Sequence, residues 1–386
     1  MPAGPPERDS AMPAGPAERD SAMPAGPAER DSAMPAGPPE RDSAMPAGPP
    51  ERDSAMPAGP PERDRPALPL LVAENLCVSF PAGKGQRLIA VEDVSLSVSE
   101  GETLGVVGES GCGKSTVARC LAGLLRPGSG TVSLRGEVLG ARRTTEQHRA
   151  VQLVFQDPYS SLNPRLSVRS VLAELLVFHG LAQGEAVERR CLELMALVGL
   201  PADALDGYPS SFSGGQRQRI AIARALAVEP QVVVADEPIS SLDVSVQAAI
   251  LALFADLRER LGIGMVLISH NLAVVRNICD RAAVMYLGRI VEVGEREEIF
   301  TDPRHPYTRA LLTAAPRLRP GPDRVAGVAA RLRGEPPSPT ARPTGCAFHP
   351  RCPRAEPVCA TQRPELLPAP AGSSRMAACH FRDETQ

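Results

Sequence analysis

The chain has 386 residues, with 42 Lys and Arg against 45 Asp and Glu and a formal net charge of −3. This balance argues against a strongly basic nucleic-acid-binding domain, and 3% aromatic residues without Trp leave few platforms for stacking bases. No apolar run reaches the roughly 18 residues that span a bilayer, and we expect no secretory signal. We therefore predict a cytosolic protein of one to three domains, with its nine cysteines reduced or bound to metal.

Residues 1–65 form a tandem repeat of the eleven-residue unit MPAGPPERDSA or MPAGPAERDSA. The units are rich in proline and poor in apolar side chains. Because such a segment buries too little surface to offset the entropy of ordering, we predict that it is disordered. A proline-rich ligand is one interpretation of these repeats. A repeat expansion, or a translation start at Met56, is the simpler one.

The next 250 residues alternate between short apolar runs and amphipathic segments. The β-rich runs are LLVAENLCVSF at 70–80 and VEDVSLSV at 91–98, followed by the short buried run TLGVV at 103–107. A helix is expected from Lys114 to about Leu125, and mostly helical structure from 158 to 205. Two more buried strands are expected at 231–236 and 264–269. This alternation predicts an α/β fold with a mainly parallel sheet and an inserted helical subdomain at about 157–215.

The stretch GESGCGKS at 108–115 satisfies the pattern G-x-x-x-x-G-K-[ST] between a predicted strand and a predicted helix, which is the context of a P-loop. Its backbone N–H groups and the helix N-terminus favour phosphate. Lys114 is expected to neutralise the β- and γ-phosphates and Ser115 to bind Mg²⁺. The expected nucleotide-binding residues here are Gly108, Glu109, Ser110, Gly111, Cys112, Gly113, Lys114, Ser115 and Thr116.

Polar residues at three other strand ends complete a nucleotide-hydrolysing site. The run VVVADEP ends in Asp236, expected to bind Mg²⁺, and Glu237, expected to act as general base on water. His270 follows the strand at 264–269 and is placed to sense the γ-phosphate. Gln156 follows another apolar run and is expected to orient water or touch Mg²⁺. The predicted catalytic residues are therefore Lys114, Gln156, Glu237 and His270.

A second small-residue motif, SGGQ at 213–216, stands at the start of a predicted helix and is another potential anion site. In chain order, all these pieces resemble the ATP-binding subunit of an ABC transporter over roughly residues 70–320. The resemblance implies a P-loop NTPase core with an inserted helical subdomain and an antiparallel β subdomain. It assigns the Q-loop to Gln156, the signature to Ser213–Gln216, Walker B to 232–236, the D-loop to 240–243 with Asp243, and the switch histidine to His270.

The resemblance also implies how the signature works. Two such domains would form a head-to-tail pair, so that Ser213, Gly214, Gly215 and Gln216 bind the nucleotide held by the partner's P-loop. An aromatic residue upstream of the P-loop would stack on adenine. Phe80 is the candidate, although it is equally expected in a strand core.

Several stretches, including VFQDPYSSLNPRLSV and IFTDPRHPYTRALLTAAP, resemble the oligopeptide/dipeptide importer ATPases. The SSLNPRLSV segment is most similar to the sequence of their F-type subunit. This implies a peripheral protein at the cytoplasmic membrane face, paired with a D-type ATPase subunit, two permeases and a solute-binding protein, and not with nucleic acid. A soluble ABC ATPase of DNA repair or translation, or a nickel or glutathione importer, is the alternative. The ABC domain is expected at 66–320.

The C-terminal extension at 321–386 carries four further cysteines, which also match that importer group. Their gaps do not follow a C-x-x-C zinc pattern. Four thiolates can hold a [4Fe–4S] cluster. The resemblance to the importer group implies such a cluster, because some of its members carry one in this region. Zinc, with His349 or His380 as a ligand, and free thiols are the other two hypotheses. The cysteines are Cys346, Cys352, Cys359 and Cys379.

Overall fold

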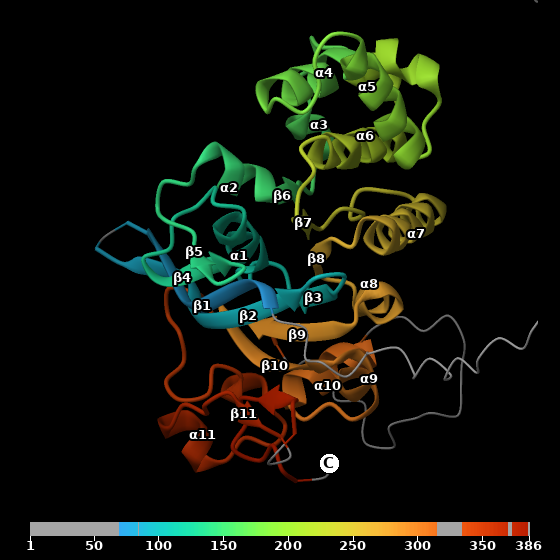
Figure 1. Ribbon diagram of the computed structural model, residues 1–386. Helices are drawn as coiled ribbons and strands as arrows, with labels where there is room; N and C mark the ends of the chain where they lie inside the picture. The colour runs from blue at the N-terminus through green and yellow to red at the C-terminus, as the bar shows by residue number, and fades with distance from the viewer. Residues whose placement is uncertain (1–68, 84, 315–333, 370–372, 385–386) are drawn as a thin grey trace, which may run out of the picture. The chain divides into compact units, whose positions relative to one another are not determined.

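The computed structural model describes residues 69–83, 85–314, 334–369 and 373–384. The predicted disorder at 1–65 lies outside these residues. Figure 1 shows the described elements, with helices α3–α6 grouped apart from the strands and the C-terminal segment next to β10. No helix in the described ranges is long and apolar enough to span a membrane.

The larger sheet formed by the described residues has eight strands in the order β11-β12-β10-β9-β3-β8-β7-β6. Its parallel centre is β9 (Arg281–Tyr286), β3 (Thr103–Val107), β8 (Gly264–Ser269), β7 (Val232–Asp236) and β6 (Val151–Val154). These strands are almost wholly buried runs rich in Val, Leu, Ile and Ala, as a parallel sheet covered on both faces requires. The prediction of a mainly parallel α/β core is confirmed.

A second, antiparallel sheet has the order β2-β1-β4-β5. Its strands are β1 (Pro69–Pro81), β2 (Arg87–Ser99), β4 (Ser129–Leu134) and β5 (Glu137–Val138). Helix α1 (Lys114–Leu121) contacts both sheets, and its apolar face joins their shared core. The expected extension of this helix to Leu125 is wrong. The helix ends at Leu121 because Gly123 adopts a left-handed φ of 75°.

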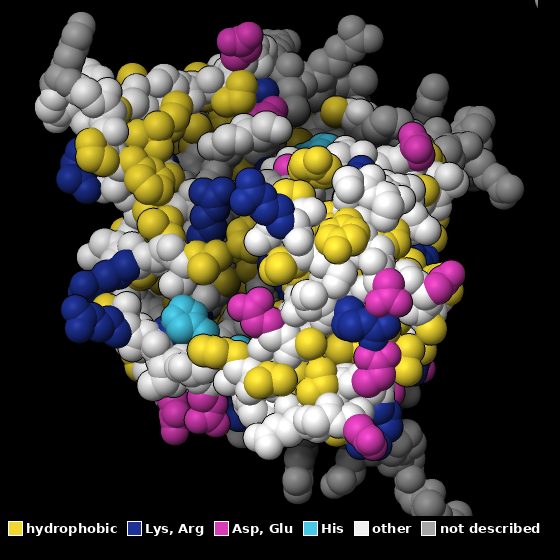
Figure 2. Space-filling view, turned by 90° about the horizontal axis from the view of Figure 1, so that it is seen from above, with side chains coloured by type: hydrophobic (Ala, Val, Ile, Leu, Met, Phe, Trp, Pro, Cys, Tyr) yellow, Lys and Arg dark blue, Asp and Glu magenta, His cyan; other side chains and the backbone are white. Residues whose placement is uncertain are grey.

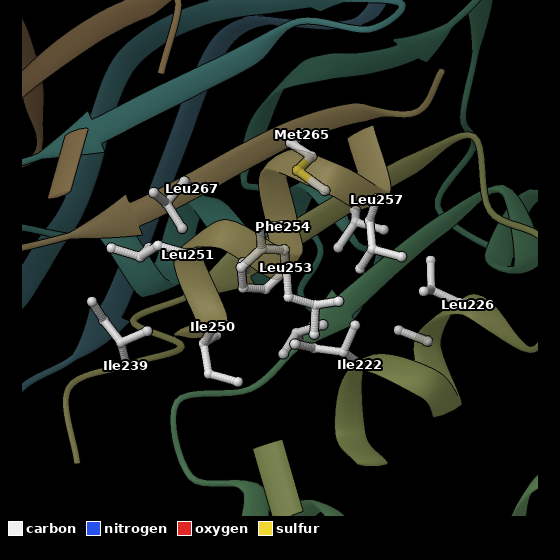
Figure 3. Close-up of a cluster of buried hydrophobic side chains, with 14 of the residues drawn as sticks. Ile222, Leu226, Ile239, Ile250, Leu251, Leu253, Phe254, Leu257, Met265 and Leu267 are labelled. Atoms are coloured by element: carbon white, nitrogen blue, oxygen red, sulfur yellow. The ribbon is translucent and has the colours of Figure 1, made fainter. Parts of the chain in front are cut away.

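Residues 158–226 contribute the helical block. Its elements are α3 (Pro158–Ser161), α4 (Val168–Phe178), α5 (Glu185–Leu197), the short 3₁₀ helices Ala202–Asp206 and Pro209–Ser211, and α6 (Gly214–Leu226). Helix α2 (Thr145–Ala150) precedes β6. Figure 3 shows the apolar cluster in which Ile222 of α6, Phe254 of α7 (Val244–Leu261) and Met265 of β8 gather, so the block is joined to the core by buried side chains.

The C-terminal part closes one edge of the larger sheet. Its elements are α8 (Leu272–Ile278), β10 (Arg289–Glu295), α9 (Arg296–Thr301), α10 (Pro306–Ala314), the 3₁₀ turn η3 (His349–Arg351), α11 (Pro357–Thr361), β11 (Leu367–Pro368) and β12 (Met376–Ala377). Strand β12 pairs antiparallel with β10, through Glu292 with Ala377 and Val293 with Met376. The extension therefore continues the sheet of the α/β core.

Candidate nucleotide-binding site

The P-loop, residues 108–115, joins β3 to α1 as predicted, with Lys114 and Ser115 as the first residues of the helix. Its glycines are needed for close packing: a Cβ on Gly108 would lie 2.1 Å from the Met285 carbonyl oxygen, and one on Gly113 2.2 Å from that of Ala90. Gly113 also has a φ of 105°, which side-chain-bearing residues rarely adopt. Larger residues at these two positions would displace the loop from the strand ends that shape it.

Lys114, the first residue of α1, points back into its own loop. Its Nζ atom donates hydrogen bonds of 2.9 Å to the Gly108 carbonyl and 3.0 Å to the Glu109 carbonyl. It also lies 3.9 Å from Glu237 Oε1. The lysine is only 4% exposed, so its charge is held among oxygen atoms close to where the expected phosphates would bind.

Ser115 and Asp236 meet although 121 residues separate them. The Ser115 Oγ–H donates a 2.9 Å hydrogen bond to Asp236 Oδ1, at the end of β7. Burial raises the pKa of Asp236, while the Ser115 bond opposes that rise. A hydroxyl and a carboxylate are hard oxygen ligands that fit Mg²⁺. The two residues therefore suit the metal that the sequence assigned to them.

Glu237 links the remaining predicted catalytic residues. Its Oε2 atom lies 2.9 Å from His270 Nδ1 and 3.4 Å from the Gln156 amide nitrogen. Its backbone N–H donates to the Ile268 carbonyl at 3.0 Å, yet its φ is 45°, in the left-handed region. Strained backbone of this kind persists where the surroundings hold it, and such positions cluster at functional sites. The structure thus brings Lys114, Gln156, Glu237 and His270 together.

The signature motif begins helix α6. Ser213 is exposed and N-caps the helix: its Oγ accepts the Gln216 N–H at 3.3 Å, and Gln216 Oε1 accepts the Ser213 N–H at 2.9 Å. A Cβ on Gly215 would lie 2.5 Å from Val246 Cγ1 of α7, so α6 approaches α7 closely there. The N–H groups of Gly214 and Gly215, in the first turn, have no partner within the helix and suit an anion.

Three other predicted nucleotide-binding residues lie near the end of β1, in the first turn of α1 and just before α7. Phe80 stands near the end of β1, opposite Leu88, with 38% of its surface exposed. Phe80 therefore does not lie in the hydrophobic core. Asp243 is exposed and precedes α7 as its N-cap residue. Thr116 is half-buried in the first turn of α1.

Two residues that the sequence did not single out also reach the P-loop. The Tyr307 hydroxyl of α10 accepts the Glu109 backbone N–H at 3.0 Å. Arg351 of the C-terminal extension donates two hydrogen bonds to the Glu109 carboxylate, at 2.8 and 3.0 Å. The sequence gives no signal for these contacts, because 198 and 242 residues separate the partners.

The four C-terminal cysteines line one small pocket, together with both histidines considered as zinc ligands. No group of three or more His, Cys, Asp or Glu side chains in the described ranges is placed to hold a metal ion, so the geometry gives the iron–sulfur and zinc hypotheses no support. Burial raises the pKa of Cys346 to about 11 and raises that of Cys352 and Cys379. The pocket-lining cysteines are Cys346, Cys352, Cys359 and Cys379.

Family models and solved structures of known proteins match this chain. A family model described as ABC transporter matches residues 91–240, and one described as oligopeptide/dipeptide transporter, C-terminal region, matches residues 291–359. Among solved structures, a dimeric bacterial ABC transporter cassette has a TM-score of 0.54 at 29% identity, covering 58% of this chain and 98% of that one. The solved CbiO1 of Clostridium perfringens gives a TM-score of 0.53 at 27% identity, covering 60% of this chain and 90% of that one.

Curated relatives match over most of the chain. The probable peptide ABC transporter ATP-binding protein y4tS of Sinorhizobium fredii is 48% identical over 322 residues, covering 81% of this chain and 90% of that protein. The dipeptide transport ATP-binding protein DppF of Escherichia coli is 47% identical over 326 residues, covering 82% of this chain and 96% of that protein. The chain therefore belongs to the ABC transporter ATPases that use ATP and Mg²⁺, in the family of oligopeptide/dipeptide transporter ATP-binding proteins.

Proposed function

We propose that this chain hydrolyses ATP to power uptake of dipeptides or oligopeptides through a partner permease. The observation that carries the proposal is the meeting, at the ends of β6, β7 and β8, of Gln156, Asp236, Glu237 and His270 with the P-loop residue Ser115. These are the groups required to bind Mg²⁺, orient water and remove its proton. Peptide as the solute rests on the names of the relatives and on the match of the C-terminal region.

In the proposed reaction, Glu237 takes the proton of the attacking water. His270 orients the Glu237 carboxylate through the 2.9 Å contact, and the Gln156 amide nitrogen lies 3.4 Å from the same oxygen. Lys114 leaves the loop carbonyls for the β- and γ-phosphates, where its charge offsets the charge that develops on them. Ser115 and Asp236 would hold Mg²⁺, which supplies charge neutralisation between the phosphates.

Part of each site comes from a second subunit in this proposal. Ser213 is exposed at the start of α6, and it and the amides of Gly214 and Gly215 are suited to the γ-phosphate on another chain's P-loop. The solved cassette that this chain resembles is described as dimeric. A D-type ATPase subunit is the proposed partner, with two permeases, a solute-binding protein and a peripheral position at the cytoplasmic membrane face.

The helical block is the proposed contact with the permease. It exposes Tyr159 by 55%, Phe178 by 71% and Tyr208 by 51%, which is unusual for large apolar side chains. Figure 2 views the molecule from above and shows hydrophobic side chains interspersed with Lys and Arg on that face. Gln156 lies between this block and Glu237, so nucleotide state and block position would be coupled.

The test of the proposed function is transport in proteoliposomes that contain the chain, its D-type partner and two permeases, with labelled dipeptide and the solute-binding protein outside. ATP-dependent dipeptide uptake is expected, and nickel or glutathione uptake without dipeptide uptake would favour the alternative importers. A rate of ATP hydrolysis that does not change when the permeases and the binding protein are added would favour a soluble ABC ATPase of repair or translation.

The metal hypotheses for the C-terminal cysteines have a separate test. Elemental analysis of the full chain purified without air would give about four irons for a [4Fe–4S] cluster, or zinc for the alternative. Free thiols would give neither metal and would react with a thiol reagent. The described ranges hold no cluster arranged to bind a metal ion, which supports free thiols.

A further inference from the structure

Glu109, the second residue of the P-loop, is held at three points. Its N–H donates to the Tyr307 hydroxyl at 3.0 Å, its carbonyl accepts from Lys114 at 3.0 Å, and its carboxylate accepts both terminal nitrogens of Arg351 at 2.8 and 3.0 Å. Two of these three partners lie outside the P-loop and α1. This loop position is thus held by two residues from the C-terminal part of the chain.

Arg351 is itself rigidly placed. Its side chain is 5% exposed, and its guanidinium lies 5.8 Å from the centre of the Tyr286 ring and 3.4 Å from the Tyr286 hydroxyl. Phe348, three residues earlier, packs edge-on against Tyr286 and tilted against Tyr307, with ring centres 5.3 and 5.4 Å apart. Arg351 therefore meets Glu109 in a fixed, bidentate geometry, which is the strong form of a charged hydrogen bond.

We propose that Arg351 is a positioning residue for ATP, and that the C-terminal extension sets ATP affinity by holding Glu109. The amides of a P-loop bind phosphate only when they already point at one spot, and ordering them after binding costs affinity. Arg351 fixes the peptide next to Gly108 and so prepares that array. The inference rests on the proposed nucleotide site at 108–115, and it goes beyond it by adding a residue from outside the ABC domain.

The experiment measures the dissociation constant of a fluorescent ATP analogue with Mg²⁺ for the full chain and for variants of Arg351, Arg363, Glu109 and Lys114. Arg351→Ala is expected to weaken binding about tenfold, because a charged hydrogen bond contributes that order of free energy. Arg351→Lys keeps the positive charge but loses the bidentate guanidinium, so its ATP affinity is expected to lie between that of Arg351→Ala and that of the wild type. Arg363→Ala is the matched control: Arg363 also joins the extension to core carboxylates, Glu92 and Asp93, outside the P-loop.

Glu109→Gln separates positioning from general damage. If Arg351 acts through Glu109, the double variant with Arg351→Ala binds no more weakly than the weaker single variant. Additive losses, or equal affinities for Arg351→Ala and Arg363→Ala, would overturn the proposal. Thermal melting without nucleotide identifies a variant that fails to fold, and Glu109→Gln and Arg351→Lys then decide.

One further variant separates this inference from the proposed function. Wild-type chain that binds no nucleotide, or Lys114→Ala that binds it like wild type, would refute the nucleotide site itself. Wild-type binding that Lys114→Ala abolishes and Arg351→Ala leaves intact would refute only the role of Arg351.

Discussion

The Ser115 hydroxyl donates a 2.9 Å hydrogen bond to the Asp236 carboxylate, joining the start of α1 to the end of β7. Asp236 is 5% exposed, and burial raises its pKa above the ordinary value. Burial of the charged Asp236 carboxylate therefore destabilises the folded chain when no cation is bound nearby. Such a placement favours function over the stability of the nucleotide-free chain.

The first prediction follows from that cost. A carboxyl with a raised folded-state pKa binds more protons in the folded chain than in the unfolded one, so stability falls as pH rises from the ordinary pKa through the raised one. Asp236→Asn is therefore expected to raise the melting temperature at neutral pH without Mg²⁺ or nucleotide, and to flatten this pH dependence. The same variant should lose Mg²⁺-dependent ATP hydrolysis. A lower melting temperature at neutral pH would contradict the assigned desolvation cost.

Glu237→Gln tests the general base. The amide keeps the size of the side chain but accepts no proton, so hydrolysis should fall by about 100-fold or more while ATP binding persists. The complex with the partner ATPase subunit should then stay closed in ATP, visible as a dimer in size-exclusion chromatography. Undiminished steady-state hydrolysis would rule out the role given to Glu237.

Ser213→Arg tests the shared site. The variant is expected to bind nucleotide at its own P-loop with wild-type affinity, while hydrolysis at the partner's P-loop falls about 100-fold from lost phosphate contacts. Because Ser213 also caps α6, the change should cost about 1 kcal/mol of stability. Thr144→Ala is the control, since it removes the capping box of α2 at a comparable cost and should leave hydrolysis unchanged. Equal hydrolysis by the two variants would mean that Ser213 serves only as a cap.

Phe80→Ala tests adenine stacking. Phe80 is 38% exposed, so its loss should leave the melting temperature nearly unchanged. Stacking on a base contributes about 1–3 kcal/mol, so ATP affinity should fall by about tenfold, and Phe80→Tyr should restore it. A lower melting temperature with unchanged affinity would identify Phe80 as a packing residue instead.

The site residues that stand at the ends of buried strands could be predicted from the sequence. Asp236 and His270 each stand at or just after the carboxyl end of a buried parallel strand, and an apolar run ending in a polar residue is visible in one sequence. Parallel strands deliver such ends to one edge, so the meeting of these residues follows from topology. The P-loop pattern fixes the local turn in the same way.

Contacts made by the C-terminal extension were not predictable. Strands β11 and β12 have two residues each, too few for any periodicity to show. Arg351 meets Glu109 across 242 residues, and the sequence around it, HPRCP, reads only as a turn between cysteines. Long-range pairs of this kind depend on packing that one sequence does not display.

The most direct test of the central claim is ATP-dependent uptake of labelled dipeptide by proteoliposomes carrying the full complex. Wild-type chain is expected to drive uptake that requires ATP, the permeases and the binding protein, whereas complexes with Lys114→Ala or Glu237→Gln should show none. Dipeptide uptake by either variant at the wild-type rate would contradict the claim that this chain's ATPase site powers import.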